Sequence, residues 1–510
     1  MENRVNTTPT DIQNYFKRVE QDDIFAQLGA SGTAAIVLIG WIFSVVFANL
    51  FVLGGFGIGV PILTAAFFGF VIPYFAKKQP LKASSYFLAA AVMLLAVGTF
   101  LHDNTGVHLI TLLVLIVLIA LTLCQMSGTG SKDVFSMQSF YQAVISVIDR
   151  PFRYLDLPFL AVKKGFKGKK LNSKVGMLVL GLIIAIPFAA IFILLLSRAD
   201  AAFDEFTTNI FDKLDLFSGD TISSIILGTL IAIYLCALLI TLRGRPQPEG
   251  KDININFSVN GILVSTVLTV INAVVVLFAL MQFKYLFAGA ALPEGMTHAE
   301  YARTGFFELC TAIAFSVAIM FFCIIFVEKI NGRLPLMVKI MLSVFIGCNF
   351  IMIASAFYRM LNYIAVFDFT VKRLLVTWLI AIFAICMIGA LIKLWAVKYR
   401  FIKHIAVTVI AMTLLLNLIN VNSFIANYNV DRHIQNVSSG KESNLDVYYL
   451  RNLGTGATRA TYRLLYEGGK DTRYLAKENL IIQAENLKEK DWQEYSLTDI
   501  TAREILKDFS

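Results

Sequence analysis

Charged residues are scarce in this sequence. They make up only 15% of the 510 residues, whereas a typical soluble domain has about a quarter, and the mean hydropathy is +0.71. The few charges gather in short segments between long apolar runs. Uncharged apolar runs of about 18 or more residues are typical of membrane-spanning helices. The composition therefore excludes an ordinary soluble protein and predicts an integral membrane protein.

Patterns that support metal, redox or catalytic chemistry are also missing. None of the six cysteines lies at CxxC spacing, and none of the five histidines pairs at metal-ligand spacing or within an HExxH motif. The glycine-rich turn at 54–57 has no Walker or GxGxxG spacing after it. We therefore predict no cofactor, no metal site and no catalytic residue, and expect the cysteines to serve as small apolar residues.

The apolar runs predict about eleven spans, because each can cross a hydrocarbon core of ~30 Å at 1.5 Å per residue. The predicted fold is an all-α polytopic transmembrane helix bundle with a small C-terminal helical tail outside the membrane. The predicted spans are 31–53, 58–76, 83–101, 107–125, 175–197, 221–242, 259–282, 305–327, 335–357, 374–397 and 405–427. They divide the chain into residues 1–30, a cytoplasmic segment; 31–125, spans one to four; 126–174, a basic loop; 175–427, spans five to eleven; and 428–510, the tail.

Lysine and arginine predict the orientation of the spans. They are frequent before span one and in the loops after spans two and four, and absent from the loops after spans one and three. Because such residues favour the cytoplasmic side, the N-terminus is expected there, and eleven spans then place the tail outside. Arg359, Lys372 and Arg373, expected in the outer loop after span nine, run against this rule. An even number of spans would move the tail to the cytoplasm.

The segment 133–170 predicts an amphipathic helix on the cytoplasmic surface. Its apolar residues recur at near-helical spacing, Pro151 is expected to break the helix, and a lysine-rich run follows. The candidate contacts to lipid headgroups are Lys163, Lys164, Lys167, Lys169 and Lys170. A second interpretation, equally open, is that these lysines only set the topology.

Polar residues near spans eight to ten are the remaining candidates for a functional site. They are Glu308, Arg359, Asn362, Asp368, Lys372 and Arg373. Ionisable residues in or near spans are common in ion and proton paths. We favour a structural interpretation, in which they pair at the membrane surface, because no ionisable residue is expected at mid-span.

The tail changes to a charged composition with helical patterns of apolar residues. Leu475, Leu480, Ile481, Ala484 and Leu487 form one such pattern. Ser496 and Asp499 predict a capping box for a last helix that ends near Leu506.

Four sequence segments carry a family resemblance. They are Tyr285-Leu286-Phe287 with AEYARTGFFEL (299–309), YRMLNYIAVFDFTVKRL (358–374), NVNSFIANYNVDRH (420–433) and LDVYYLRNLG (445–454). These segments cover about residues 250–455. In this region the chain resembles bacterial multi-pass membrane proteins with a domain of unknown function of the 4173 type, with the 4153 type as a close relative. The resemblance implies a bacterial cytoplasmic membrane and no known activity.

Three functions stay open on this basis. The first is a structural, assembly or signalling membrane protein whose tail binds a protein partner. The second is a transporter of a small solute through the polar residues of spans eight to ten. The third is a membrane-bound enzyme. The expected partners are the lipid bilayer and a protein at the tail; nucleic acid is not expected, because the basic residues gather in short loops.

Overall fold

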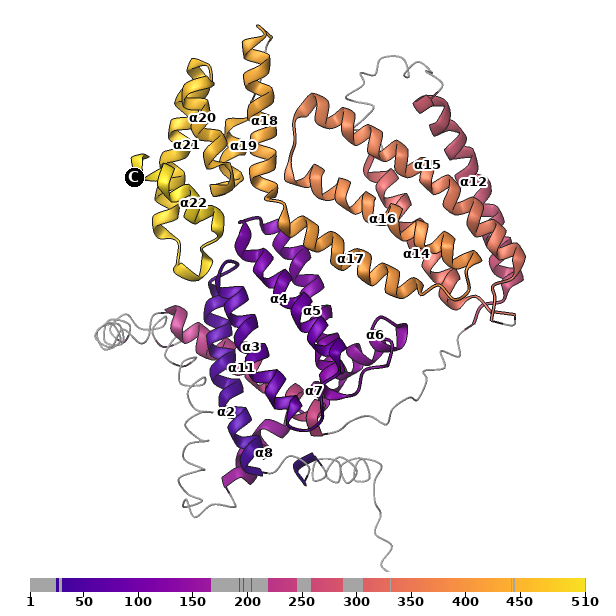
Figure 1. Cartoon of the computed structure of the whole chain (residues 1–510), viewed down its shortest axis with the longest axis vertical. Helices are drawn as coiled ribbons and strands as arrows, with labels where there is room; N and C mark the ends of the chain where they lie inside the picture. The colour runs from indigo at the N-terminus through magenta and orange to yellow at the C-terminus, as the bar shows by residue number, and fades with distance from the viewer. Residues whose placement is uncertain are drawn as a thin grey trace, which may run out of the picture. The chain divides into compact units, whose positions relative to one another are not determined.

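The computed structural model describes residues 24–26, 30–166, 192, 196, 203, 219–244, 258–287, 306–330, 332–441, 443 and 445–509. Their regular structure is almost entirely helical (Figure 1), with two isolated β-bridges as the exceptions in these ranges. The described residues form two compact units. Unit 1 draws on residues 1–100, 115–251 and 490–496, and unit 2 on residues 101–114, 252–489 and 497–510.

The predicted all-α membrane fold is confirmed. Within the described ranges, ten helices are long and apolar enough to cross a membrane, with 18 to 32 residues each. They correspond to ten of the eleven predicted spans. Of the remaining prediction, residues 175–197, only residues 192 and 196 are described, so this span is not tested.

In unit 1, α2 (Ala30–Phe47) packs closely against α11 (Gly219–Gly244). A Cβ atom at Gly228 would lie 2.5 Å from the Cα of Val45, and one at Gly40 would lie 2.6 Å from the sulfur of Cys236. Small residues therefore let the two helices approach, as is common between membrane helices. Trp41 Nε1 also donates to Thr229 Oγ1 across the contact, at 3.0 Å.

The remaining helices of unit 1 follow the predicted spans and the amphipathic segment. They are η1 (Ala48–Leu53), α3 (Gly59–Ala76), α4 (Ala83–Leu101), α5 (Thr105–Ser127, of which residues up to 114 belong to unit 2), α6 (Met137–Val144), η2 (Ile145–Asp149), α7 (Arg150–Arg153) and α8 (Leu157–Phe166). Pro151 does not break the helix as predicted. It lies in α7, which follows the π-helical turn η2 directly, and the helix continues through it to Arg153. The break comes at Tyr154, whose φ of −125° is not helical.

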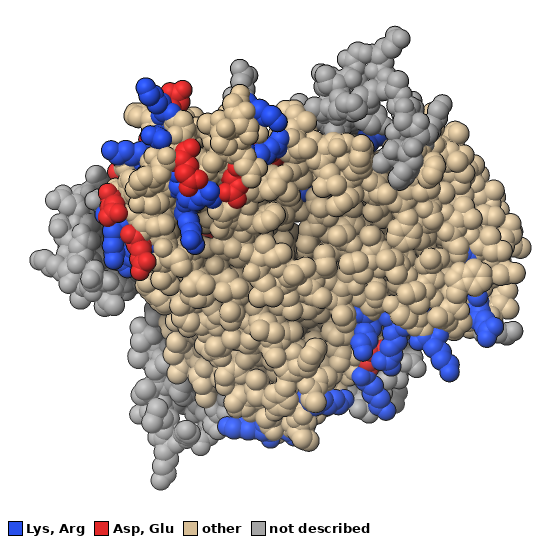
Figure 2. Space-filling model, turned by 45° about the horizontal axis from the view of Figure 1, so that its top comes forward, with Lys and Arg blue, Asp and Glu red and all other residues tan. Residues whose placement is uncertain are grey.

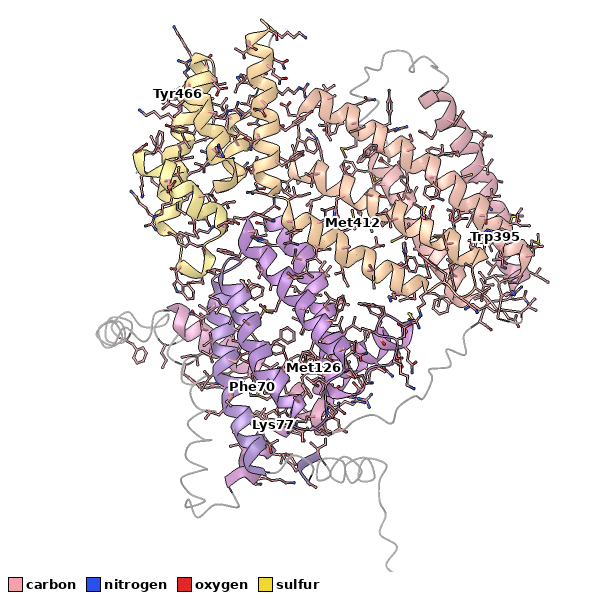
Figure 3. The ribbon with its side chains drawn as sticks, viewed as in Figure 1. Phe70, Lys77, Met126, Trp395, Met412 and Tyr466 are labelled. Atoms are coloured by element: carbon pink, nitrogen blue, oxygen red, sulfur yellow. The ribbon has the colours of Figure 1, made fainter. Side chains whose placement is uncertain are left out.

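In unit 2, the apolar bundle consists of α12 (Gly261–Phe287), α14 (Phe306–Phe326), α15 (Leu336–Phe367), α16 (Val371–Trp395) and α17 (Phe401–Leu418). Fully buried aliphatic side chains such as Ile313, Leu342 and Ile346 form its core. Trp378 Nε1 of α16 donates to the carbonyl of Met412 in α17, at 3.1 Å; Figure 3 labels Met412 on α17. At 1.5 Å per residue, the 32 residues of α15 extend ~48 Å. Span nine therefore continues ten residues past its predicted end at 357, and Arg359 and Asn362 lie within the helix.

The tail helices of unit 2 form a second hydrophobic core, with Val107 of α5 and Leu416 of α17 among its members. The tail elements are α18 (Val421–Ser438), α19 (Val447–Asn452), η3 (Gly454–Ala457), α20 (Thr458–Glu467), α21 (Lys470–Glu489), α22 (Leu497–Leu506) and η5 (Lys507–Phe509). Helix α22 has the predicted bounds. On α21, however, Ile481 is exposed, while Asn479 and Gln483 are buried. Their amides donate to the carbonyls of Val447 and Gly454, at 2.6 and 3.2 Å, so polar contacts set that face.

Candidate functional site

The turn between α15 and α16 consists of residues 368–370, and its backbone is unusual. Asp368 has φ 63° and ψ 176°, and it is the one non-glycine residue with positive φ in the described ranges. Such a conformation costs about 1–3 kcal/mol and persists only where the surroundings fix it. The contacts around Asp368 must therefore hold the turn in this conformation.

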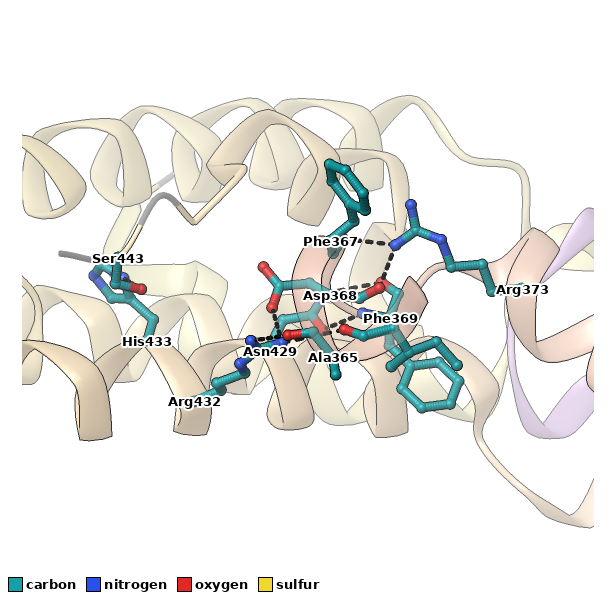
Figure 4. A network of polar contacts seen from close by, with 10 residues as sticks. Ala365, Phe367, Asp368, Phe369, Arg373, Asn429, Arg432, His433 and Ser443 are labelled. Atoms are coloured by element: carbon teal, nitrogen blue, oxygen red, sulfur yellow. Dashed lines mark hydrogen bonds and ion pairs between the residues drawn. The ribbon is translucent and has the colours of Figure 1, made fainter. Parts of the chain in front are cut away.

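Two arginines bind this turn (Figure 4). Arg432 of α18 forms an ion pair with Asp368, at 3.0 Å, and donates to the carbonyls of Ile364, at 3.1 Å, and Ala365. Arg373 donates to the carbonyls of Phe367, at 2.6 Å, and Asp368. The last carbonyls of a helix lack intrahelical donors, and cations are favourable there. The two guanidinium groups therefore cap the C-terminus of α15.

Two further tail residues bind the same turn through its backbone. Asn429 of α18 accepts from Phe369 N and donates to Phe369 O, both at 2.9 Å, and Tyr449 of α19 accepts from Val371 N at 2.8 Å. These side chains satisfy backbone groups as a neighbouring strand would. We call Asp368, Arg373, Asn429, Arg432 and Tyr449 the turn clasp.

Hydrogen bonds contribute more to the turn clasp than its ion pair does. The side chains of Arg432 and Asp368 are 30% and 29% exposed, and an ion pair so open to solvent adds at most about 1 kcal/mol. The three hydrogen bonds of Asn429 and Tyr449 to the backbone are part-buried and contribute about 0.5–1.5 kcal/mol each. Burial raises the pKa of the Asp368 carboxyl, and this effect outweighs the opposing attraction of Arg432 and Arg373. Fixing the end of α15 is thus the main physical consequence.

A second polar group, also in unit 2, lies between residues 101–111 and helices α17 and α18. We call it the Asn422 cluster, and its members are fully or almost fully buried: His102, Asn104, His108, Thr111, Asn417 and Asn422. Asn422 donates to the carbonyls of Asp103 and Leu453, the latter at 2.9 Å, and accepts from Asn104. Asn104 Oδ1 accepts from Val107 N at 3.0 Å and so caps the start of α5. One tail residue thus joins three chain segments.

The two histidines of the Asn422 cluster stack with their ring planes 9° apart and their centroids 5.9 Å apart. His102 Nε2 lies 3.1 Å from the carbonyl of Asn417, and His108 Nε2 lies 2.9 Å from the carbonyl of His102. Because a carbonyl can only accept, both Nε2 atoms carry the proton. Burial lowers the pKa of His102 below its ordinary value, against the opposing effects of its bond to Asn417 and of Asp103.

Acidification should therefore destabilise the tail through His102. A base with a lowered folded-state pKa binds fewer protons when folded, so stability that is present above the ordinary value of 6.5 is lost as the pH falls below it. The variant His102→Gln keeps a donor for the Asn417 carbonyl but cannot ionise. We expect the thermal unfolding midpoint of the purified protein to fall less for this variant between about pH 7.5 and pH 5. Equal falls in the variant and the parent protein would contradict this role.

In unit 1, a third contact joins the glycine-rich turn after span one to residues of the tail. The N–H of Ile58 donates to the carbonyl of Tyr495 at 3.0 Å. A Cβ atom at Gly57 would lie 2.4 Å from the carbonyl carbon of Glu494. The glycines at 54–57 were interpreted as a tight turn. Gly57 in addition leaves room for the backbone of segment 490–496, which includes η4 (Trp492–Glu494).

The structure brings together only part of the predicted polar set. Asp368 and Arg373 meet in the turn clasp, and Lys372 and Arg373 line a cavity with Phe306. Glu308 is exposed in the first turn of α14, and Asn362 is half-buried.

Arg359, also in this set, is buried and donates to Gln282 Oε1 of α12 at 3.1 Å. Along α15 it lies nine residues, or about 13 Å, before Asp368. The contacts of Arg359 and Asp368 thus lead to different neighbours, and the role of the set stays a prediction.

The partners that the tail supplies were not among the residues predicted from the sequence. Asn429 and Arg432 of the turn clasp and Asn422 all come from one helix, α18. A signal was present: Asn422 and Asn429 are seven residues apart and therefore lie on one face of a helix. Both belong to the segment 420–433, and Asp368 belongs to the segment 358–374, so two of the segments that carry the family resemblance bind each other.

The basic amphipathic segment presents an apolar stripe. At near-helical spacing along α6 to α7, five large apolar side chains are 42 to 62% exposed: Met137, Tyr141, Val144, Ile148 and Phe152. The Lys164 ammonium lies 4.3 Å from the ring centre of Phe25, and Lys163 is exposed. Lys167, Lys169 and Lys170 lie outside the described residues. The exposed stripe fits the predicted position on a membrane surface, which stays a prediction.

Comparisons with known proteins give a family and no activity. Across the described ranges, no group of three or more His, Cys, Asp or Glu could hold a metal ion. No curated protein and no solved structure matches the chain. A family model for a domain of unknown function, DUF4153, matches residues 89–464. The match does not support the predicted resemblance to the 4173 type. It also extends well upstream of residue 250, where the resemblance was expected to begin. The chain is a multi-pass membrane protein that belongs to the DUF4153 family.

Proposed function

We propose that this protein is a membrane scaffold that holds a rigid helical module outside the cytoplasm, where the module binds a protein partner. The observation that carries the proposal is the attachment of the tail. Side chains and backbone of the tail bind the loops at 54–58, 102–104 and 368–370, and each contact lies within its own unit. A tail so attached has a fixed surface, and a preorganised surface binds a partner at a lower entropic cost.

The same attachments support the proposed sidedness. If the predicted span at 175–197 is counted, the three loops follow spans one, three and nine, which supports a tail on the side of the odd-numbered loops. With the observed helix bounds, these loops contain Asp103 and Asp368 and no lysine or arginine. The loops after spans two, eight and ten contain Lys77, Lys78, Lys82, Lys329, Arg333, Lys398 and Arg400. Arg359 lies within α15, whereas Lys372 and Arg373 stand in the first turn of α16 and still run against the positive-inside rule at this surface. The rule then favours a cytoplasmic even-numbered side and an extracytoplasmic tail.

The exposed tyrosines of the tail are the proposed contact surface. Tyr448, Tyr466 and Tyr474 are 54%, 66% and 73% exposed, and Tyr466 projects from α20 (Figure 3). Acidic and basic side chains lie together over the tail, at the upper left of Figure 2, whereas much of the visible surface has no charge. Protein interfaces are enriched in tyrosine, with a polar rim around it.

A photo-cross-linking side chain in place of Tyr466 or Tyr474 tests the proposal in cells. We expect a discrete protein adduct from both positions. The same side chain in place of Tyr86, which is 50% exposed on α4 in unit 1, is the matched control and should not give that adduct. If neither tail position gives an adduct that is absent from the Tyr86 control, the partner-binding function is wrong.

A further inference from the structure

A cavity of about 660 Å³ opens between three helix ends of unit 2. Its walls are the start of α14, the last turns of α15 and the start of α16, and the lining residues are Phe306, Phe307, Met360, Tyr363, Thr370, Lys372, Arg373, Leu375 and Val376. Six of these nine side chains are apolar or aromatic. All three helices are candidate membrane spans, and the cavity lies at their ends, so we expect it at the level where hydrocarbon meets the headgroup layer.

The polar side of this cavity is basic. Lys372 is exposed in the first turn of α16, and the Arg373 guanidinium lies 4.2 Å from the ring centre of Tyr363. Arg373 Nη1 donates to the carbonyls of Phe367 and Asp368, and these hydrogen bonds hold its side chain in place. Two of the described acidic residues are near: Asp368, which pairs with Arg432, and Glu308, which follows Phe307 on α14 and is not among the lining residues. Among the residues that the structure describes, the cavity wall therefore carries two positive charges and no negative charge.

We propose that this cavity binds an anionic phospholipid. Its phosphate would contact Lys372 and Arg373, and an acyl chain would cover Phe306, Leu375 and Val376. A small soluble anion would leave the apolar walls in water, at a free-energy cost proportional to the apolar area that stays exposed. A zwitterionic lipid would bind more weakly, because each basic side chain near a membrane surface raises the affinity for anionic lipid roughly fivefold. The proposal does not depend on the partner-binding function of the tail.

The variant Lys372→Glu tests the charge. An acidic residue in the first turn of a helix interacts favourably with the helix dipole, so the fold should tolerate the change. Lys398→Glu is the matched control, because Lys398 is exposed in the loop between α16 and α17 and does not line the cavity. The full-length proteins are placed in nanodiscs of phosphatidylcholine with a minor share of phosphatidylglycerol, released, and examined by native mass spectrometry for retained lipid.

We expect the parent protein and Lys398→Glu to retain phosphatidylglycerol over phosphatidylcholine, and Lys372→Glu to retain at least about fivefold less. Equal retention by the two variants would overturn the site. Equal retention of both lipids by the parent protein would overturn the preference for anionic lipid. Displacement of phosphatidylglycerol by free glycerol phosphate would show a soluble anion as the ligand, and would also overturn the proposal. A thermal unfolding midpoint for each variant shows that the compared proteins are folded.

Discussion

Gly57→Ala should release segment 490–496 from the turn after span one. The new methyl carbon would lie 2.4 Å from the Glu494 carbonyl carbon and 2.5 Å from the Gln493 carbonyl oxygen, so the backbone of one segment has to move. Overpacking of this kind costs about 1–3 kcal/mol. A local loss of about 2 kcal/mol raises the open population roughly 30-fold. Trypsin cleavage after Lys488 or Lys490 in the folded protein should accelerate by a similar factor.

Gly69→Ala is the control for this prediction. Gly69 lies within α3, and a Cβ atom there would meet no atom within 4 Å. Alanine is about 1 kcal/mol more favourable than glycine inside a helix, so this variant should be as resistant to trypsin as the parent protein. If Gly57→Ala is cleaved no faster than Gly69→Ala, the close approach of segment 490–496 to the turn is not present in solution.

Asn422→Leu is expected to have the largest effect on the stability of unit 2. The change removes the hydrogen-bond partner of three groups at once: the Asn104 amide and the carbonyls of Asp103 and Leu453. A buried polar group left without a partner costs about 1–3 kcal/mol. We expect a loss of about 3 kcal/mol, since not all three groups will stay buried after the change. Thermal unfolding in detergent, followed by protease resistance of the tail, measures it.

The same helix offers the matched control. Asn427 of α18 also donates from its amide, but only to the backbone and side chain of Ser423, one turn earlier in that helix. Asn427→Leu should cost less than about 1 kcal/mol, because the Ser423 carbonyl lies inside the helix and keeps its own backbone donor. Similar losses for the two variants would mean that Asn422 contributes little more to stability than a local contact.

The sequence by itself determined the fold class and most of the spans, because the cost of placing charge and unpaired backbone in hydrocarbon leaves few alternatives to long apolar helices. It also predicted the last helix, α22, because the pattern of Ser496 and Asp499 at its start lies within a single turn. Helix ends at the membrane surface were harder. The end of α15 was predicted near residue 357, just before the charged residue Arg359. In the structure Arg359 is buried and donates to Gln282, and the helix continues to Phe367.

Only the tertiary structure decided how the tail is held and what surrounds Asp368. Arg432 caps α15, and Asn422 binds residues 103 and 104, more than 300 positions earlier in the chain, as well as residue 453. Such contacts depend on which helix faces meet, and a short-range pattern contains no information about that. The same holds for the cavity beside Lys372, whose walls come from three helices. Local physics fixed the helices of this membrane protein, and packing between them fixed its polar contacts.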